Sequence, residues 1–146
     1  MKHGAECLIH LGDVGTMEVI DALCVAGPSD QLQLPAHVVF GNTDWDLDAL
    51  WDYASDLDVA VDHPVGRIQL DDGELIYCHG HEPAPMQEAI DRGVRYLCHG
   101  HTHRRADDHR GATRVINPGA LFRAGAYTVA LLDTSSDSLD FYELSG

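Results

Sequence analysis

Four short segments of this chain place a polar, metal-ligating side chain at the end of an apolar stretch and next to a glycine. These segments are His10-Leu11-Gly12-Asp13, Gly41-Asn42-Thr43-Asp44, His79-Gly80-His81 and Gly100-His101-Thr102-His103. The ends of neighbouring strands meet at one edge of a sheet, and binding sites gather there. Glycine lets the backbone turn sharply and lets a ligand approach closely. The pattern therefore predicts a sheet whose edge brings the four segments together.

Apolar periodicity predicts strands and helices that alternate in the first half of the chain. Strands are expected over 7–11 and 36–40, and helices over 17–25 and 46–57. Asp71-Asp72-Gly73 predicts a hairpin turn between strands over 66–70 and 74–78. The remaining expected elements are a helix over 85–91 and strands over 94–98, 113–116, 127–132 and 139–142. Strand–helix units that give way to antiparallel strands indicate an α/β fold of sheets covered by helices.

The composition excludes several classes of protein. The 146 residues fit a single domain over 1–146. The net charge of −15, from 24 acidic and 9 basic residues, repels phosphate backbones and argues against general nucleic-acid binding. No apolar run approaches the ~20 residues of a membrane span, and the first residues lack the apolar core of a secretion signal. The expected location is the cytoplasm, where disulfides are not expected.

The cysteines admit a second interpretation of the histidine segments. Cys7, Cys78 and Cys98 lie in or beside apolar runs, which predicts that they are buried. Cys78 and Cys98 also stand three residues before His81 and His101, a spacing that structural zinc sites permit. A zinc site of this kind leaves the two earlier glycine segments without a role.

The candidate ligands offer oxygen and nitrogen but no thiolate. They are the carboxylate of Asp13, the amide of Asn42 and the imidazoles of His79, His101 and His103. Mixed oxygen and nitrogen ligation suits manganese, iron, nickel or zinc. Two such ions, about 3.5–4 Å apart, clamp a phosphoryl group and lower the pKa of a bound water. The ligand set therefore favours metal-dependent hydrolysis of a phosphate ester.

The same segments resemble a known family, the calcineurin-like metallophosphoesterases, and within it the small bacterial and archaeal phosphodiesterases. The matching segments are Gly12-Asp13, Gly41-Asn42, His79-Gly80-His81 and Gly100-His101-Thr102-His103, and Asn117-Pro118-Gly119-Ala120 is similar to the branch's Asn-Pro-Gly-Ser turn. The resemblance runs from about residue 4 to residue 142. It implies a four-layer αββα sandwich with metal ions at its rim.

The resemblance also implies a role for each ligand. Asp13 is expected to bridge two divalent metal ions, which are Mn, Ni, Fe or Zn. Asn42, His79 and His101 complete the second metal site, and His103 belongs to the first. The implied activity is hydrolysis of a small-molecule phosphate ester, and more specifically of a diester, by metal-activated water.

Other polar residues near the ligands have smaller expected roles. His81 follows a ligand and is expected to contact the substrate phosphate as the catalytic residue. Thr43 stands where many relatives carry a histidine that protonates the leaving group, and threonine cannot do so at neutral pH. Diesters with good leaving groups would suffer least from this change. The histidines that receive no role are His3, His10, His37, His63 and His109.

One departure from the family concerns the start of the sequence. The family opens with a strand that carries an Asp-x-His motif, and residues 1–5 align with the end of the helix after it. The first metal would keep only Asp13 and His103, so one bound ion in place of two is a second expectation. Without this central strand, backbone groups and apolar surface would be uncovered. This predicts that the chain forms a homo-oligomer, exchanges elements with a second copy, or is only marginally stable.

A retromer subunit of the same fold binds other proteins, so the alternative function is a catalytically impaired, protein-binding scaffold.

Overall fold

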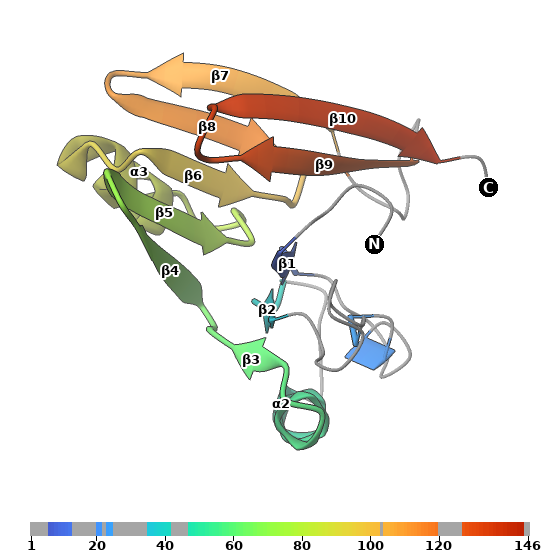
Figure 1. The fold of residues 1–146 in the computed structure, drawn as a ribbon. Helices are drawn as coiled ribbons and strands as arrows, with labels where there is room; N and C mark the ends of the chain where they lie inside the picture. The colour runs from blue at the N-terminus through green and yellow to red at the C-terminus, as the bar shows by residue number, and fades with distance from the viewer. Residues whose placement is uncertain are drawn as a thin grey trace.

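A computed structural model of the chain describes residues 6–12, 20–21, 23–24, 35–41, 47–102, 104–119 and 127–144. The strands are β1 (Leu8–His10), β2 (Ala36–Val38), β3 (Ala60–Val61), β4 (Val65–Leu70), β5 (Gly73–Cys78), β6 (Tyr96–His99), β7 (Ala106–Arg110), β8 (Thr113–Asn117), β9 (Tyr127–Asp133) and β10 (Ser138–Leu144) (Figure 1). The helices are α2 (Leu47–Asp56) and α3 (Pro83–Arg92). Within these ranges, no helix has the length and apolar character needed to cross a membrane.

The strands form two layers that face each other. The larger sheet has the order β4-β5-β6-β8-β7, with β5, β6 and β8 parallel and the edge strands β4 and β7 antiparallel to their neighbours. Parallel strands β1, β2 and β3 form a second sheet, and β9 and β10 form an antiparallel hairpin. Ile9 of β1 packs against the same apolar cluster of the larger sheet as Leu132 of β9 and Leu139 of β10. Both smaller sheets therefore cover one face of the five-stranded sheet.

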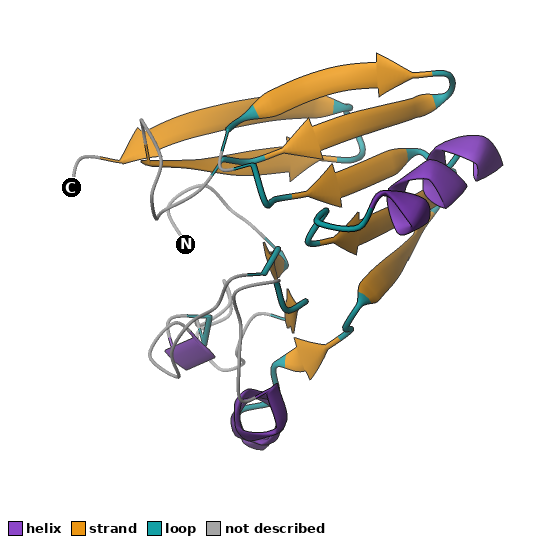
Figure 2. Cartoon of the chain, turned by 180° about the vertical axis from the view of Figure 1, so that it is seen from behind, coloured by secondary structure: helices purple, strands orange, loops and turns teal. Residues whose placement is uncertain are grey.

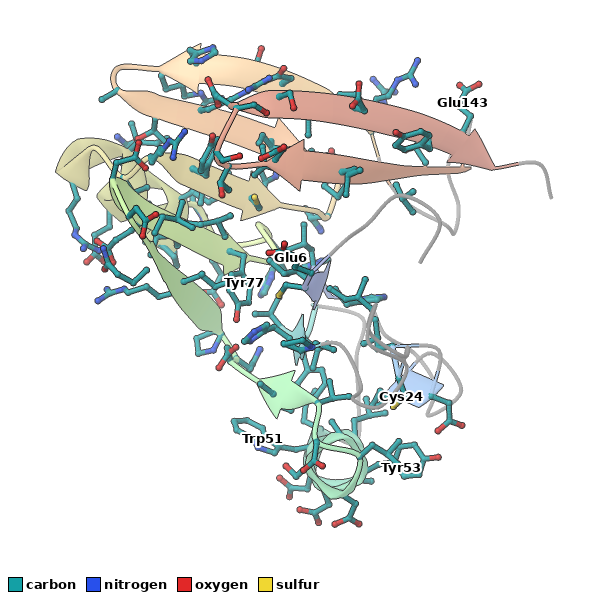
Figure 3. The ribbon with its side chains drawn as sticks, in the orientation of Figure 1. Glu6, Cys24, Trp51, Tyr53, Tyr77 and Glu143 are labelled. Carbon is teal, nitrogen blue, oxygen red and sulfur yellow. The ribbon has the colours of Figure 1, made fainter. Side chains whose placement is uncertain are left out.

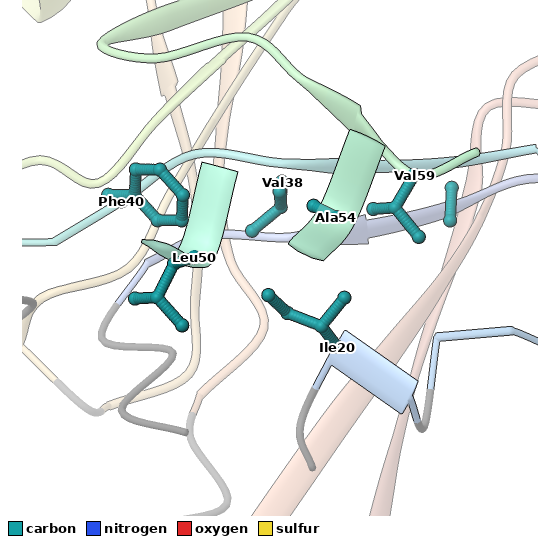
Figure 4. Packing of buried hydrophobic residues seen from close by; sticks show 7 residues of the cluster. Ile20, Val38, Phe40, Leu50, Ala54 and Val59 are labelled. Carbon is teal, nitrogen blue, oxygen red and sulfur yellow. The ribbon is translucent and has the colours of Figure 1, made fainter. Parts of the chain in front are cut away.

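The two helices cover the outer faces of these layers (Figure 2). On the larger sheet, Ala89 of α3 packs with Ile76, Leu97 and Val115. Against the three-stranded sheet, α2 packs its buried residues Leu50 and Ala54 in a cluster whose other members are Ile20, Ala36, Val38, Phe40 and Val59 (Figure 4). The layers follow the order helix, sheet, sheet, helix, so the expected αββα architecture is confirmed.

Most predicted elements form close to their predicted limits, but two strands were not predicted. β3 is only two residues long, and β7 reads Ala-Asp-Asp-His-Arg with mostly exposed side chains. Among the described strands, β7 pairs only with β8, at the edge of the sheet, where charged residues discourage pairing with other chains. The helix expected over 17–25 lies for the most part outside the described residues, of which Ile20 and Asp21 are helical.

The hairpin of β9 and β10 is fastened to the larger sheet through its turn. Asp137 in that turn accepts a hydrogen bond from the Tyr96 hydroxyl at 2.6 Å and another from Arg114 Nη1 at 2.9 Å. Arg114 also donates to both carboxylate oxygens of Asp107 at 2.8 Å. These contacts hold the turn of the hairpin against the residues where β6 and β8 begin.

Candidate metal centre

Two neighbouring parallel strands, β5 and β6, end at the same edge of the larger sheet, and each leads into a histidine segment. Cys78 pairs with His99 at the end of the ladder. Beyond the strands, the backbone N–H of Gly100 donates to the carbonyl of His79 at 2.8 Å. The sheet ladder therefore continues into the two segments and holds them side by side.

Three imidazole rings gather at this edge. The ring centroids of His79 and His101 are 5.1 Å apart, those of His79 and His81 are 5.3 Å apart, and those of His81 and His101 are 6.2 Å apart. His79 is buried, whereas His101 is exposed. The structure thus brings together three of the six residues that the sequence predicts for the site. The other three, Asp13, Asn42 and His103, lie outside the described residues.

The orientation of His79 is fixed by the segment that follows β1. His79 Nδ1 donates a hydrogen bond to the carbonyl of Leu11 at 2.7 Å. A histidine that binds a metal through one nitrogen usually donates the other N–H to a carbonyl or carboxylate, which fixes the ring and its tautomer. The neutral ring therefore carries its proton on Nδ1 and its lone pair on Nε2. This arrangement fits a metal ligand.

Gly12 is what allows this close approach. Its φ is +104°, a conformation that favours glycine. A Cβ at this position would lie 2.4 Å from His79 Nδ1 and 2.9 Å from the backbone nitrogen of Gly41. The first, second and third glycine segments therefore meet at one point, as the sequence predicts.

His101 has an unusual backbone. Its φ is +69°, in the left-handed region that residues with a side chain rarely adopt. Such strain costs about 1–2 kcal/mol and tends to occur at functional sites. Next to it, the N–H of Thr102 donates to the carbonyl of Gly100 at 2.9 Å, closing a tight turn. The turn presents the imidazole beside His79.

Asn117, at the end of β8, holds this turn from behind. Its side chain is fully buried and donates to the carbonyl of Gly100 at 3.1 Å and to the Thr102 hydroxyl at 2.9 Å. Its carbonyl accepts from the N–H of Gly119 at 2.9 Å. The sequence predicts Asn117 only as part of a turn motif. The Asn-Pro-Gly motif nevertheless indicates this role in the sequence, because an asparagine side chain often accepts a hydrogen bond from the backbone of its own turn.

His81 lies beside a small pocket at the same edge. The residues that line the pocket are Pro64, Cys78, His79, Gly80, His81, Glu82 and Pro85. His81 Nε2 is 3.3 Å from a carboxylate oxygen of Glu82. His81 Nδ1 is buried, and among the described residues it has no hydrogen-bond partner. Buried polar atoms are nearly always paired, so a partner for this nitrogen is expected from outside the described residues, either another part of the chain or a ligand.

The match to a known family covers nearly the whole chain. The model of the calcineurin-like phosphoesterase superfamily domain matches residues 1–137. The chain belongs to this superfamily. Among solved structures, a novel archaeal phosphodiesterase is similar, with 26% identity, a TM-score of 0.83, and coverage of 98% of this chain and 86% of that one. No curated protein sequence matches significantly.

Two solved structures of lower identity share the fold. Yfce, a phosphoesterase from E. coli, has 22% identity and a TM-score of 0.60, with 99% of this chain and 87% of that chain covered. A single mutant of Vps29 from Entamoeba histolytica has 17% identity and a TM-score of 0.63, with 96% and 83% covered. At these identities the likeness shows the fold alone.

The cysteines do not form the alternative zinc site. Cys78 packs with the cluster under α3, whereas Cys98 packs with the cluster between the two strand layers. Burial raises the pKa of the Cys78 thiol to about 11 and that of the Cys98 thiol to about 12. Zinc binds thiolates, so neither environment favours it. The prediction that Cys7 is buried is wrong, because its position just before the short strand β1 leaves it exposed.

A complete metal site needs donors beyond the three imidazoles. Within the part of the chain that the structure describes, no three His, Cys, Asp or Glu residues are placed to hold a metal ion by themselves. The predicted ligands Asp13, Asn42 and His103 lie outside the described residues. The orientation of His79, and the buried Nδ1 of His81 that has no partner in the described part of the chain, fit a bound ion and its substrate.

Proposed function

We propose that the chain is a metal-dependent phosphodiesterase that cleaves a small-molecule phosphate ester in the cytoplasm. The observation that carries this proposal is the cluster of His79, His81 and His101 at the joined ends of β5 and β6. Membership in the calcineurin-like phosphoesterase superfamily supports the phosphoesterase chemistry. The similar archaeal phosphodiesterase supports a diester as the substrate.

Divalent ions would be held by the residues that the sequence predicts. Asp13, Asn42, His79 and His101 would hold one ion, and Asp13 with His103 would contribute to a second. Bound Mn, Ni, Fe or Zn supplies positive charge that polarises the phosphoryl oxygens and acidifies a water molecule. The hydrogen bond from His79 to Leu11 would keep the His79 ring aimed at its ion.

His81 would bind the phosphate group itself. Its buried Nδ1 can donate to a phosphoryl oxygen, and a carboxylate oxygen of Glu82 lies 3.3 Å from Nε2 on the other side of the ring. In the reaction, a water oxygen bonds to phosphorus and the bond from phosphorus to the leaving oxygen breaks.

The test is hydrolysis of bis(p-nitrophenyl) phosphate by chelator-treated protein with and without added Mn²⁺ or Ni²⁺. We expect turnover only with metal, and slower turnover of the corresponding monoester. Replacing His81 with glutamine should lower kcat/KM by roughly 10- to 100-fold, the value of one hydrogen bond to a charged group. His109→Gln, on the exposed edge strand β7, is the matched control and should leave the rate unchanged.

The alternative function, a protein-binding scaffold with an impaired site, predicts a different result. A folded protein that shows no metal-dependent turnover of either ester would contradict the phosphodiesterase proposal and favour the scaffold. Equal loss in the His81 and His109 variants would contradict the role of His81.

A further inference from the structure

The chain crosses from the three-stranded sheet to the larger sheet through a short segment beside the candidate metal centre. This β3–β4 link consists of residues 62–64. Its last residue, Pro64, lines the same small pocket as His79 and His81. Directly after it, Val65 begins the pairing of β4 with β5. The link therefore joins the two sheets next to two of the predicted site residues.

His63 in this link supports the strand that leads toward Asn42. At the end of the β2–β3 ladder, the backbone N–H of Asp62 donates to the carbonyl of Val38 at 3.0 Å. Beyond that bond, the N–H of Phe40 donates to His63 Nδ1 at 3.2 Å. Phe40 is fully buried, and a buried backbone N–H needs an acceptor. The imidazole therefore fixes the backbone two residues before Asn42 in the sequence.

Asp62 ties the link to a strand of each sheet. Its Oδ2 accepts a hydrogen bond from the Tyr77 hydroxyl and lies 2.9 Å from His37 Nδ1. His37 lies in β2, whereas Tyr77 lies in β5, two residues before His79. Burial, followed by the hydrogen bond to Asp62, raises the pKa of the Tyr77 hydroxyl well above its usual range. The hydroxyl therefore keeps its proton and stays a donor to Asp62.

The Tyr77 side chain is confined on several sides. Figure 3 shows it on β5, on the side that faces the three-stranded sheet. Tyr77 is fully buried, and its ring meets the His37 ring edge-on with centroids 5.9 Å apart. On β4, a Cβ at Gly66 would lie 2.0 Å from a ring carbon of Tyr77, so the ring lies against the glycine backbone. A hydroxyl on so confined a ring sets the distance between β5 and Asp62.

The segments after β2 and β5 approach each other closely at the site. A Cβ at Gly12 would lie within 3 Å of both His79 Nδ1 and the backbone nitrogen of Gly41. Apolar contact between two sheets is non-directional and does not fix their offset. Groups that share one metal ion must be placed to within about 0.5 Å. Bringing Asn42 and His79 to one ion therefore needs directional contacts between the sheets, and the β3–β4 link supplies them.

We propose that Asp62 and His63 are positioning residues that hold the segments carrying Asn42 and His79 at the separation needed to share one metal ion. They act through β2 and β5 and not as ligands. This role rests on the proposed function, because it concerns the same metal site. A purely structural role would lower the stability of the fold but leave the Mn²⁺ affinity of the folded protein unchanged.

The first test measures Mn²⁺ affinity by calorimetry in chelator-treated, folded protein. His63→Leu removes the acceptor for the Phe40 N–H, and we expect Mn²⁺ to bind about tenfold more weakly, the lower end of the effect of groups that support a ligand. His63→Asn keeps a side-chain oxygen that can accept this bond and should restore most of the lost affinity. His109→Leu, on the exposed strand β7, is the control and should bind Mn²⁺ as wild type does. Equal affinity in His63→Leu and wild type would overturn the role of His63.

The second test needs no metal. The proton that His79 Nδ1 donates to the Leu11 carbonyl can be followed by NMR, and its exchange with solvent reports how often this bond opens. Tyr77→Phe removes only the hydroxyl that binds Asp62, and exchange should become roughly tenfold faster, as expected for the loss of one hydrogen bond to a carboxylate. Asp62→Leu should have the same effect, whereas Asp62→Asn keeps an oxygen acceptor and should exchange more slowly than Asp62→Leu. An unchanged exchange rate in Tyr77→Phe would overturn the role of Asp62, even if Asp62→Leu does not fold.

Together the two tests separate the positioning role from the proposed function. Wild-type protein that binds no Mn²⁺ would contradict the metal-dependent function, and proton exchange at His79 would still decide whether Asp62 positions the ring. Faster exchange in Tyr77→Phe together with weaker Mn²⁺ binding in His63→Leu would support both.

Discussion

Replacing His79 with glutamine is expected to abolish metal-dependent diester hydrolysis while the protein stays folded. Glutamine has a similar volume and can still donate a hydrogen bond to the Leu11 carbonyl, but it cannot offer the imidazole nitrogen. Changes to groups that merely support a metal ligand cost 10- to 100-fold in affinity or activity. Loss of the ligand itself should therefore lower Mn²⁺ affinity by about 100-fold or more.

The measurement is calorimetric titration of Mn²⁺ into chelator-treated protein, followed by kinetics with bis(p-nitrophenyl) phosphate. His109→Gln removes an imidazole from the exposed strand β7 and serves as the control. Unchanged Mn²⁺ affinity in the His79 variant, at equal helix and sheet content, would show that His79 is not a ligand. The buried position of His79 would then have a purely structural cause.

Replacing Gly12 with alanine is expected to cost about 3 kcal/mol of folding stability and to abolish activity as well. The new methyl group would overlap His79 and the backbone of Gly41, and overpacking of this kind typically costs 1–3 kcal/mol. The φ of +104° adds backbone strain for any residue with a side chain. The overlap with the His79 ring can be relieved only if His79 moves away from Leu11, so stability and metal affinity should fall together.

A matched control separates overlap from backbone strain. Gly111, in the turn between β7 and β8, also has a positive φ, of +61°, but a Cβ there meets no atom within 4 Å. Gly111→Ala should therefore cost only about 1–2 kcal/mol and leave hydrolysis intact. Urea denaturation and diester kinetics on both variants provide the comparison. If Gly12→Ala retained Mn²⁺ affinity, the close contact between Gly12 and His79 would have no role in the site.

The sequence predicts the layered fold because its apolar periodicity is strong where strands and helices are long. Strand β7 was not predicted because backbone pairing with β8, and not an apolar pattern, holds Ala-Asp-Asp-His-Arg in the sheet. For the site, His79, His81 and His101 could be predicted to lie together, since each follows a strand that ends at the same edge. The orientation of the His79 ring could not be predicted, because it depends on a hydrogen bond to the backbone carbonyl of Leu11. Every residue type has such a carbonyl, so the sequence gives no sign of this contact.

The contacts of Asp62 with His37 and Tyr77 could not be predicted from the sequence. His37 lies in β2, Asp62 directly follows β3 and Tyr77 lies in β5, and none of the three forms a motif with its neighbours in sequence. Only the register of β2 and β3 brings His37 beside Asp62. Burial of Cys7 was predicted from the apolar run that follows it, but the residue precedes the first pleat of β1 and remains exposed.

The bond between Gly100 and His79 makes the histidine segments part of the sheet and not independent loops. Asn117 fixes the same turn from a third strand, so three successive strands of one sheet contribute to its position. Opening this corner would require peeling β6 away from β5 and β8. The imidazoles should therefore keep their mutual geometry until the sheet itself melts, and heat should inactivate the protein in a single step together with its β-structure.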